Sequence, residues 1–265
     1  MSKKNLLDKY YTNPKVVKEC ISFLPNDFFE LSVIEPSAGS GNFINELPVD
    51  SSFLAFDLEP DHPSVEKQDF LNLDLSKDLI FNFLGNPPFG FASNLAIKFF
   101  NKAAINARYI AFIVPKTFKK LSVQEKLNKK LHLISDNTLP KNSFILEGKE
   151  YDVPCCFQVW EKKEYDRETP FAELLAKPEI FLFVSKSKSN RLVCVRRAGG
   201  KAGQLLKGWD HAETSTYWIK PLIDKKLFIE ILKSLNLDLT GNTAGVKSIS
   251  KKELTILINE KFYSN

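Results

Sequence analysis

Short apolar runs alternate with amphipathic segments over the first 160 residues of the chain. Three of the runs end at an aspartate, a glycine or a proline, and short apolar runs of this kind predict buried β-strands. We expect strands over residues 31–34, 53–56, 79–84, 109–114, 131–134 and 153–160, and a weaker one that ends near residue 70. Strands this apolar are typical of a mostly parallel sheet that is covered on both faces. The pattern therefore predicts an α/β domain with helices on both sides of the sheet.

Two segments between these strands have the period of amphipathic helices. Pro14 stands at a favourable first position, and the apolar residues at positions 16, 17, 20, 21 and 24 share one helix face. Residues 93–107 predict a second helix, whose apolar positions are 95, 97, 99, 100 and 103. Both segments would cover the predicted sheet with their apolar faces.

A charged run from Glu161 to Glu168 has no apolar period and predicts a solvated boundary between two domains. We place a larger domain at residues 1–164 and a smaller α+β domain at residues 165–265. The smaller domain opens with strand-like runs at 180–184 and 191–195, which the short polar segment between them predicts to be a hairpin. Helix-like stretches follow at positions 222–235 and 250–261.

The net charge of +5 is distributed unevenly along the 265 residues. Residues 1–160 carry 18 basic and 19 acidic side chains, whereas residues 161–265 carry 19 and 13. Between positions 180 and 209 there are seven Lys or Arg and no acidic residue. A basic domain attached to a near-neutral one predicts a polyanionic partner, with nucleic acid as the first choice.

Neither a signal peptide nor a membrane-spanning segment is expected. The polar N-terminal residues lead into no apolar region, and no run of 18 apolar residues occurs anywhere. The four cysteines lack C-x-x-C spacing and the three histidines are scattered, so we expect no metal site. The adjacent Cys155 and Cys156 would point to opposite faces of a strand. We therefore expect a cytoplasmic or nucleoid-associated protein with reduced thiols and no membrane partner.

The segment Val-Ile-Glu-Pro-Ser-Ala-Gly-Ser-Gly-Asn-Phe at residues 33–43 runs from a predicted strand into a glycine-containing loop. Gly39 and Gly41 lack the side chains that would block a ligand, although such a pair also occurs in plain tight turns. In a doubly wound sheet this loop lies at the carboxyl edge, where ligands bind. Glu35 just before the glycines and Asp57 at the end of the next strand strengthen the prediction, because a carboxylate at the position of Asp57 can accept hydrogen bonds from ribose hydroxyls.

A second loop, Gly-Asn-Pro-Pro-Phe-Gly at residues 85–90, follows the fourth predicted strand. Its two prolines restrict the backbone and remove two N–H donors, which leaves carbonyl acceptors. The Asn86 side-chain oxygen and the Pro87 carbonyl would accept both hydrogens of an exocyclic amine, while the amine's ring would stack on Phe89. Accepting both hydrogens favours a pyramidal nitrogen, whose lone pair then points out of the ring plane as a nucleophile.

The two loops, in this order, resemble those of class I S-adenosylmethionine-dependent N6-adenine DNA methyltransferases of the gamma motif order. In that family a Glu/Asp-Pro-x-x-Gly-x-Gly loop binds the methyl donor, and Asn-Pro-Pro-Tyr/Phe is the catalytic loop. The resemblance covers roughly residues 8–160. It implies a Rossmann-like, doubly wound, mostly parallel seven-stranded methyltransferase sheet, followed by a smaller recognition domain. It also implies catalytic roles for Asn86, Pro87, Pro88 and Phe89.

Further matches imply where the methyl donor binds. Residues 8–14, Asp-Lys-Tyr-Tyr-Thr-Asn-Pro, resemble the family element that contacts the donor's amino-acid end, with Asn13 inserted before the proline. Asp57 falls at the ribose position, and the pair Asp69-Phe70 matches residues that bind the donor's adenine. The donor-binding residues implied by the resemblance are Tyr11, Thr12, Glu35, Pro36, Ser37, Ala38, Gly39, Gly41, Asp57, Leu58, Asp69, Phe70 and Asn86.

The family also uses an aromatic residue from its last hairpin to stack on the far face of the target base. We prefer Phe144 for this role, from its place after the segment Pro140–Ser143, and keep Tyr151 as the alternative. A core position for Phe144 is equally compatible with the sequence.

Asn86 favours adenine as the target, because relatives that methylate cytosine N4 usually have Ser-Pro-Pro in this loop. We expect a site-specific DNA adenine-N6 methyltransferase that flips its target base. It would act alone or beside a separate restriction endonuclease in a restriction-modification system. RNA is the alternative substrate, since unpaired adenines need no flipping.

Two weaker alternatives are a non-catalytic nucleic-acid-binding subunit and a protein glutamine N5-methyltransferase. The first typically loses the donor glycines or the catalytic loop, and the second usually has tyrosine after Asn-Pro-Pro and no need of a basic domain.

Seven basic side chains in the smaller domain are candidates for contacts to phosphates. Small residues between Arg197 and Gly203 would let the backbone approach a phosphate, and Arg196 and Arg197 could instead reach guanine edges. Each of the seven is also compatible with an ordinary solvated surface. The candidates are Lys186, Lys188, Arg191, Arg196, Arg197, Lys201 and Lys207.

Overall fold

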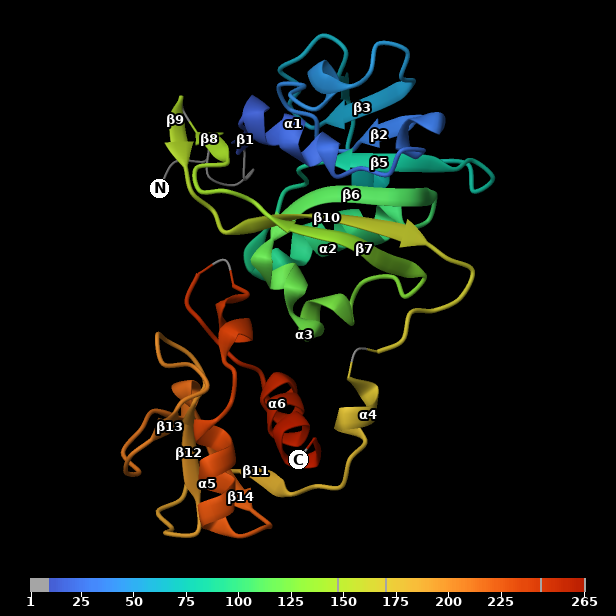
Figure 1. Cartoon of the computed structure of the whole chain (residues 1–265). Coiled ribbons are helices and arrows are strands. Elements are labelled where there is room, and N and C mark those ends of the chain that lie inside the picture. Colours follow the sequence, from blue (N-terminus) through green and yellow to red (C-terminus); the bar gives the residue numbers. More distant parts are fainter. Residues whose placement is uncertain (1–9, 147, 170, 244, 265) are drawn as a thin grey trace. The chain divides into compact units, whose positions relative to one another are not determined.

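The structure, a computed structural model, describes residues 10–146, 148–169, 171–243 and 245–264. The chain divides into two compact units (Figure 1). The first unit contains the chain up to Phe118 together with Val123–Arg167, and the second contains Lys119–Ser122 and the chain from Glu168 onward. The short helix α3 (Leu121–Gln124) spans one of these divisions.

Within the described residues, a seven-stranded sheet forms the centre of the first unit. Its first five strands run parallel to one another, whereas β10 is antiparallel to both β6 and β7. Across the sheet the order is β4 (Glu66–Lys67), β3 (Phe53–Asp57), β2 (Val33–Glu35), β5 (Phe81–Gly85), β6 (Ala107–Pro115), β10 (Cys155–Lys162) and β7 (Leu131–Thr138). This confirms the predicted Rossmann-like, mostly parallel sheet. Its strand order reverses between β2 and β5, which creates a crevice at their carboxyl ends.

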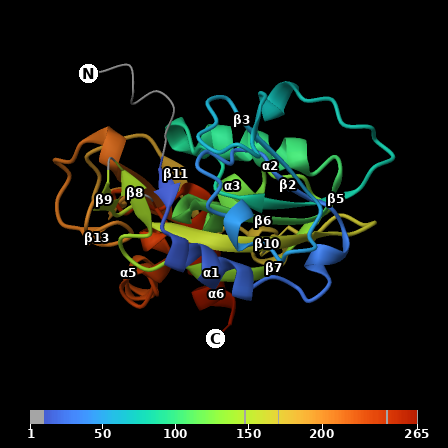
Figure 2. The same cartoon turned by 90° about the horizontal axis from the view of Figure 1, so that it is seen from above.

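Helices α1 (Pro14–Ser22) and α2 (Asn94–Ala103) cover opposite faces of this sheet (Figure 2). Residues of α1 pack in one apolar cluster with Leu84 and Cys155, and residues of α2 pack in a second cluster with Phe83 and Cys156. The clusters are separated because neighbouring residues of a strand point to opposite faces. The prediction for the adjacent cysteines is therefore confirmed.

Local side-chain hydrogen bonds decide where two of these elements begin or end. Asn13, the residue inserted in the family-like element, caps α1 because its Oδ1 accepts from the N–H of Lys15 at 3.1 Å. The weak strand predicted to end near residue 70 ends earlier, at Lys67. The Asp69 carboxylate instead accepts from the N–H of Leu71 at 3.0 Å and caps a short 3₁₀ helix over Phe70–Asn72.

A small antiparallel sheet that the hydrophobic pattern did not predict belongs to the same unit. It consists of β1 (Tyr11–Thr12), β8 (Phe144–Leu146) and β9 (Lys149–Tyr151). Thr12 pairs with Phe144, and Tyr11 pairs with Ile145. The sheet thereby fixes residues near the N-terminus against a hairpin more than a hundred residues away.

The second unit is a four-stranded antiparallel sheet with helices on one face. The sheet order is β11 (Phe181–Val184), β14 (Thr216–Pro221), β12 (Val193–Arg196) and β13 (Leu205–Leu206). The predicted hairpin is wrong, because β14 lies between β11 and β12 and pairs with both. The predicted helices are present as α5 (Lys225–Lys233) and α6 (Lys251–Tyr263), and α4 (Ala172–Leu175) is a single turn.

Apolar side chains from α5 and α6 form one core cluster with residues of this sheet. The helix α6 begins with a reciprocal capping box, in which Ser250 and Glu253 each accept a hydrogen bond from the other's backbone N–H. In the described ranges, no helix is both long and apolar enough to cross a membrane.

Candidate active site

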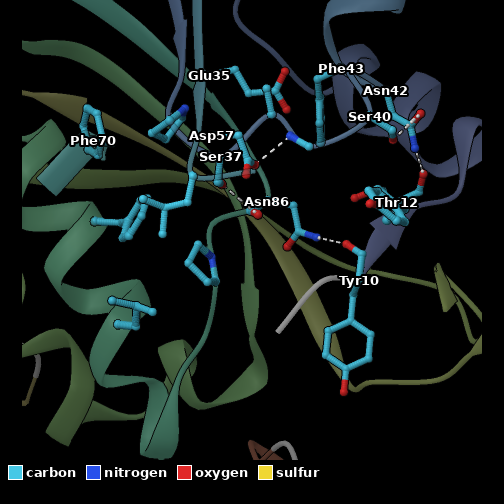
Figure 3. Close-up of a pocket in the computed structure, with 18 of the residues that line it drawn as sticks. Tyr10, Thr12, Glu35, Ser37, Ser40, Asn42, Phe43, Asp57, Phe70 and Asn86 are labelled. Atoms are coloured by element: carbon cyan, nitrogen blue, oxygen red, sulfur yellow. Dashed lines mark hydrogen bonds between the residues drawn. The ribbon is translucent and has the colours of Figure 1, made fainter. Parts of the chain in front are cut away.

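A cavity of about 270 Å³ opens at the carboxyl edge of the parallel strands in the first unit (Figure 3). Its wall comes from β1, from the loops that follow β2, β3 and β5, from the start of the 3₁₀ helix at Phe70 and from α2. The sequence-predicted residues that line it are Tyr11, Thr12, Glu35, Pro36, Ser37, Ala38, Gly39, Asp57, Leu58, Asp69, Phe70, Asn86 and Pro88. These thirteen residues come from the two loops, from β1, from the end of β3 and from the Asp69-Phe70 pair, and they make up more than half of the cavity wall.

Other lining residues were missed. They are Tyr10, Ser40, Asn42, Phe43, Gln68, Leu71, Gly90, Leu95 and Phe99. Ser40, Asn42 and Phe43 lie in the glycine loop and Gly90 ends the proline loop, so the contribution of both loops to the cavity is larger than predicted. Leu95 and Phe99 were assigned only to the apolar face of a helix, and nothing in their pattern distinguishes a cavity wall from a core position.

The glycine loop is tied to the neighbouring strand and to β1. The N–H of Gly39 donates to Asp57 Oδ2 at 2.8 Å, and Asn42 Nδ2 donates to the carbonyl of Thr12 at 2.7 Å (Figure 3). Asp57 Oδ1 accepts a further bond from the N–H of Glu59 at 2.9 Å. The Asp57 carboxylate is therefore held in place by backbone donors at the cavity wall, and each oxygen keeps a lone pair for a ligand.

Gly41 is not among the residues that line the cavity, and its contact with the methyl donor stays a prediction. Its φ is +74°, and a Cβ atom there would lie 2.8 Å from two carbon atoms of the His62 ring. The requirement for glycine comes from the left-handed backbone and from packing against His62.

Glu35 ends β2 with its carboxylate in the cavity wall and its side chain 5% exposed. Its Oε2 atom is buried and has no hydrogen-bond partner among the described residues. Burial raises the pKa of this carboxyl well above its ordinary 4.5, and the nearby charge of Asp57 raises it further, against a lowering by the N–H of Ile44. A cationic donor group in the cavity would satisfy this oxygen and favour the ionised form.

Asn86 is held between the glycine loop and the N-terminal segment. Its side-chain Nδ2 donates to the backbone carbonyl of Tyr10 at 3.1 Å, and the backbone carbonyl of Asn86 accepts from Ser37 Oγ at 3.1 Å (Figure 3). The bond to Tyr10 uses the amide nitrogen, which leaves the oxygen as the group that can accept. This Oδ1 atom is buried and lacks a partner in the described part of the chain.

The residues predicted to stack on a target base, Phe89, Phe144 and Tyr151, are not among those that line the cavity. Neither Phe89 nor Pro87 belongs to the described cavity wall, and Phe89 packs edge-on against Phe144 with ring centroids 6.5 Å apart. Phe144 is fully buried in the core cluster beneath α1, so neither face of its ring is open to a base, which contradicts its predicted role. The alternative, Tyr151, is partly exposed and stacks on Tyr10 at 5.2 Å.

The candidate phosphate contacts belong to the second unit, and three of them have intramolecular partners. Arg196 Nη1 donates to Ser215 Oγ at 3.1 Å, and the Arg197 guanidinium lies 5.8 Å from the centre of the Tyr217 ring. Lys186 Nζ donates to the carbonyl of His211 at 2.9 Å and lies over the Trp218 ring. The exposed candidates, besides Lys186 and Arg197, are Lys188, Arg191, Lys201 and Lys207.

No protein-family model matches the chain, and no curated protein matches it significantly. Solved structures do match. A candidate RNA methyltransferase from Pyrococcus horikoshii is 15% identical with a TM-score of 0.49, and the match covers 61% of this chain and 90% of that one. A candidate class I S-adenosylmethionine-dependent methyltransferase from Listeria monocytogenes is 16% identical with a TM-score of 0.45, over 60% and 63% of the two chains. The 23S rRNA methyltransferase ErmE is 10% identical with a TM-score of 0.40, over 95% and 98%.

Proposed function

We propose that this chain is an S-adenosylmethionine-dependent methyltransferase that methylates the exocyclic N6 of adenine in DNA. The observation that carries the proposal is a pair of buried acceptor atoms in one cavity wall, Glu35 Oε2 and Asn86 Oδ1, neither of which has a partner among the described residues. A buried acceptor without a partner costs about 1–3 kcal/mol. A ligand set that brings donors to both atoms would remove this cost.

The chemistry of the cavity suits the methyl donor. Glu35 would accept from the ammonium group of the donor, whose positive charge would offset the cost of ionising this buried carboxyl. Asp57 would accept from the ribose hydroxyls, while Asp69 and Phe70 would contact the adenine ring. When bound, S-adenosylmethionine supplies an electrophilic methyl group on a sulfonium.

Asn86 would act on the target amine. Its Oδ1 accepts one amine hydrogen and the Pro87 carbonyl accepts the other, which exposes the nitrogen lone pair toward the methyl group. The bonds from Asn86 to Tyr10 and from Ser37 to Asn86 keep this acceptor in place before the substrate arrives. Catalysis in this scheme rests on positioning and on preorganised acceptors.

The choice of DNA rests on the basic second unit and on the adenine preference of the Asn-Pro-Pro-Phe loop. Lys188, Arg191, Lys201 and Lys207 are exposed there and would contact phosphates. RNA adenine is the alternative substrate in this proposal, because the same cavity would accept an unpaired adenine.

The proposal is tested by incubating the purified protein with labelled S-adenosylmethionine and with duplex DNA, single-stranded DNA or RNA, followed by mass spectrometry of the nucleosides. N6-methyladenine in DNA that is absent with Asn86→Ala is the expected result. Long-read methylation profiling of a host that expresses the chain would then identify the sequence context. Labelled RNA without labelled DNA would move the substrate to RNA, and label in neither polymer would refute the proposed function.

A further inference from the structure

An aromatic side chain beside the catalytic loop lies almost wholly in solvent. Phe91 is 92% exposed, and of the large apolar residues that the structure describes only Val49 is more exposed. Most of the chain's other phenylalanines are buried or half-buried, because an apolar ring loses its favourable free energy of burial when it stays in water. The exposure of Phe91 therefore needs an explanation.

Hydrogen bonds hold the segment around Phe91 rigidly. The carbonyl of Phe89 accepts from the N–H groups of Leu95 and Ala96, at 3.1 and 3.3 Å. Ser93 Oγ lies 2.6 Å from Thr117 Oγ1 in the short 3₁₀ helix Lys116–Lys119 that follows β6, which ties the segment to that helix. The backbone that carries the exposed ring is thus held by hydrogen bonds, so fixing this backbone on ligand binding would cost little conformational entropy.

The backbone of this turn is strained on both sides of Phe91. Gly90, Ala92 and Ser93 have φ values of +65°, +52° and +63°, of which the last two belong to residues that rarely adopt them. A Cβ atom on Gly90 would lie 2.7 Å from Leu95 Cβ, so the turn also needs glycine to close. Strain of this kind is concentrated at functional sites.

Phe91 also stands next to the cavity. Gly90, which precedes it, and Leu95, a few residues later, both line the cavity wall. Adjacent Cα atoms are about 3.8 Å apart, so the exposed ring begins at the rim. Asn94 and Lys98 are exposed on α2, one helical turn apart.

We propose that Phe91 is a stacking platform for the nucleic-acid base next to the target adenine. This inference rests on the proposed function and adds a contact at the rim that neither the catalytic loop nor the basic second unit supplies. A base has an apolar face whatever its identity, so the platform would tolerate many sequences.

The test compares Phe91→Ala, Phe91→Leu and Phe91→Trp with the wild type, and with Val49→Ala as a matched loss of an exposed apolar side chain. Loss of one stacked base should weaken nucleic-acid binding and raise KM about 5- to 150-fold in the alanine variant. Leucine should restore little, because it is apolar but has no flat face, whereas tryptophan should keep wild-type binding. Donor binding should be unchanged in all variants.

A substrate series makes the contact specific. Oligonucleotides with an abasic site at each position around the target adenine are bound to wild type and Phe91→Ala. At the stacked position the abasic site should weaken binding by the wild type but not by the variant. Equal binding by Phe91→Ala and wild type, equal binding by Phe91→Leu and wild type, or no position with this coupling would overturn the proposal. These failures would be seen with a protein that still methylates nucleic acid, so they differ from failure of the proposed function.

Discussion

Replacement of Glu35 by glutamine should change stability and donor binding in opposite directions. The buried Glu35 carboxyl has an oxygen without a partner in the described structure, and its pKa is raised above 4.5, chiefly by burial. Between the unfolded pKa near 4.5 and the raised folded pKa, the unfolded chain is ionised while the folded one holds its proton. Glu35 therefore lowers the free energy of unfolding progressively as pH rises through this window.

The Glu35→Gln variant cannot ionise, so its stability relative to wild type should increase as pH rises above about 4.5. Each tenfold difference between the folded and the unfolded acid dissociation constant corresponds to about 1.4 kcal/mol of stability, or roughly 3–6 °C in Tm for a unit of this size. Donor binding should weaken, because one charge-assisted hydrogen bond contributes about 1.5–3 kcal/mol, or roughly 10- to 150-fold in Kd.

The assay is thermal unfolding of both proteins from pH 4.5 to 8, with calorimetric titration of S-adenosylmethionine over the same range. Wild-type affinity should rise with pH as a bound ammonium group favours the ionised carboxylate, and the affinity of the variant should stay flat. Glu66→Gln, an exposed glutamate on β4, is the matched control and should show neither effect. Equal donor affinity in wild type and Glu35→Gln would refute the reasoning, as would a stability difference that does not change with pH.

Three further substitutions test the site, the basic unit and the glycine loop. Asn86→Ala should reduce methyl transfer by at least about 100-fold while donor Kd changes little, because the lost acceptor acts on the target amine; radiolabel transfer and calorimetry measure the two. Arg196→Gln with Arg197→Gln should weaken nucleic-acid binding and lower the salt slope by up to about 2, measured by fluorescence anisotropy at several salt concentrations. Gly41→Ala should destabilise the first unit by about 1–3 kcal/mol in thermal unfolding, because it strains a left-handed φ and collides with the His62 ring.

Each of these has its own control. Substantial transfer by Asn86→Ala would show that the loop does not bind the target amine. Lys15→Gln with Lys67→Gln removes the same charge from exposed positions of the first unit and should leave the salt slope unchanged. Gly200→Ala, where an added Cβ meets no described atom within 4 Å, should not alter stability. If Gly41→Ala is equally neutral, the packing argument at His62 is wrong.

The sequence predicted those parts of the site that depend on local chemistry. The residues of a loop are consecutive in the sequence, and the carboxyl ends of parallel strands meet at one edge of a sheet, so the sequence predicts that the glycine loop, Asp57 and Asn86 lie together. Pairings between distant segments were missed. The pairings of β1 and β14 could not be predicted from their own residues. Tyr11–Thr12 is too short to show a period, and the residues of Thr216–Pro221 do not indicate which strands they pair with.

The burial of Phe144 also could not be predicted from the sequence. An aromatic residue in a hairpin has the same sequence pattern whether it faces solvent or core, and burial is decided by what packs against it. Here Tyr10 and Phe89 do so, at centroid distances of 6.2 and 6.5 Å. The exposure of Phe91 could not be predicted for the same reason, because it depends on a turn whose φ values do not follow from the residue pattern.

The buried cysteines can report local unfolding in each of the two units. All four are buried thiols, and burial raises the pKa of Cys20, Cys155 and Cys194, so these thiols should not react with alkylating agents while their surroundings stay folded. Cys20 and Cys155 belong to the first unit and Cys194 to the second. Pulsed alkylation followed by peptide mass spectrometry would therefore give a separate opening free energy for each unit from the unmodified chain. Added methyl donor should slow labelling at Cys20 and Cys155, whereas nucleic acid bound through the basic unit should slow it at Cys194.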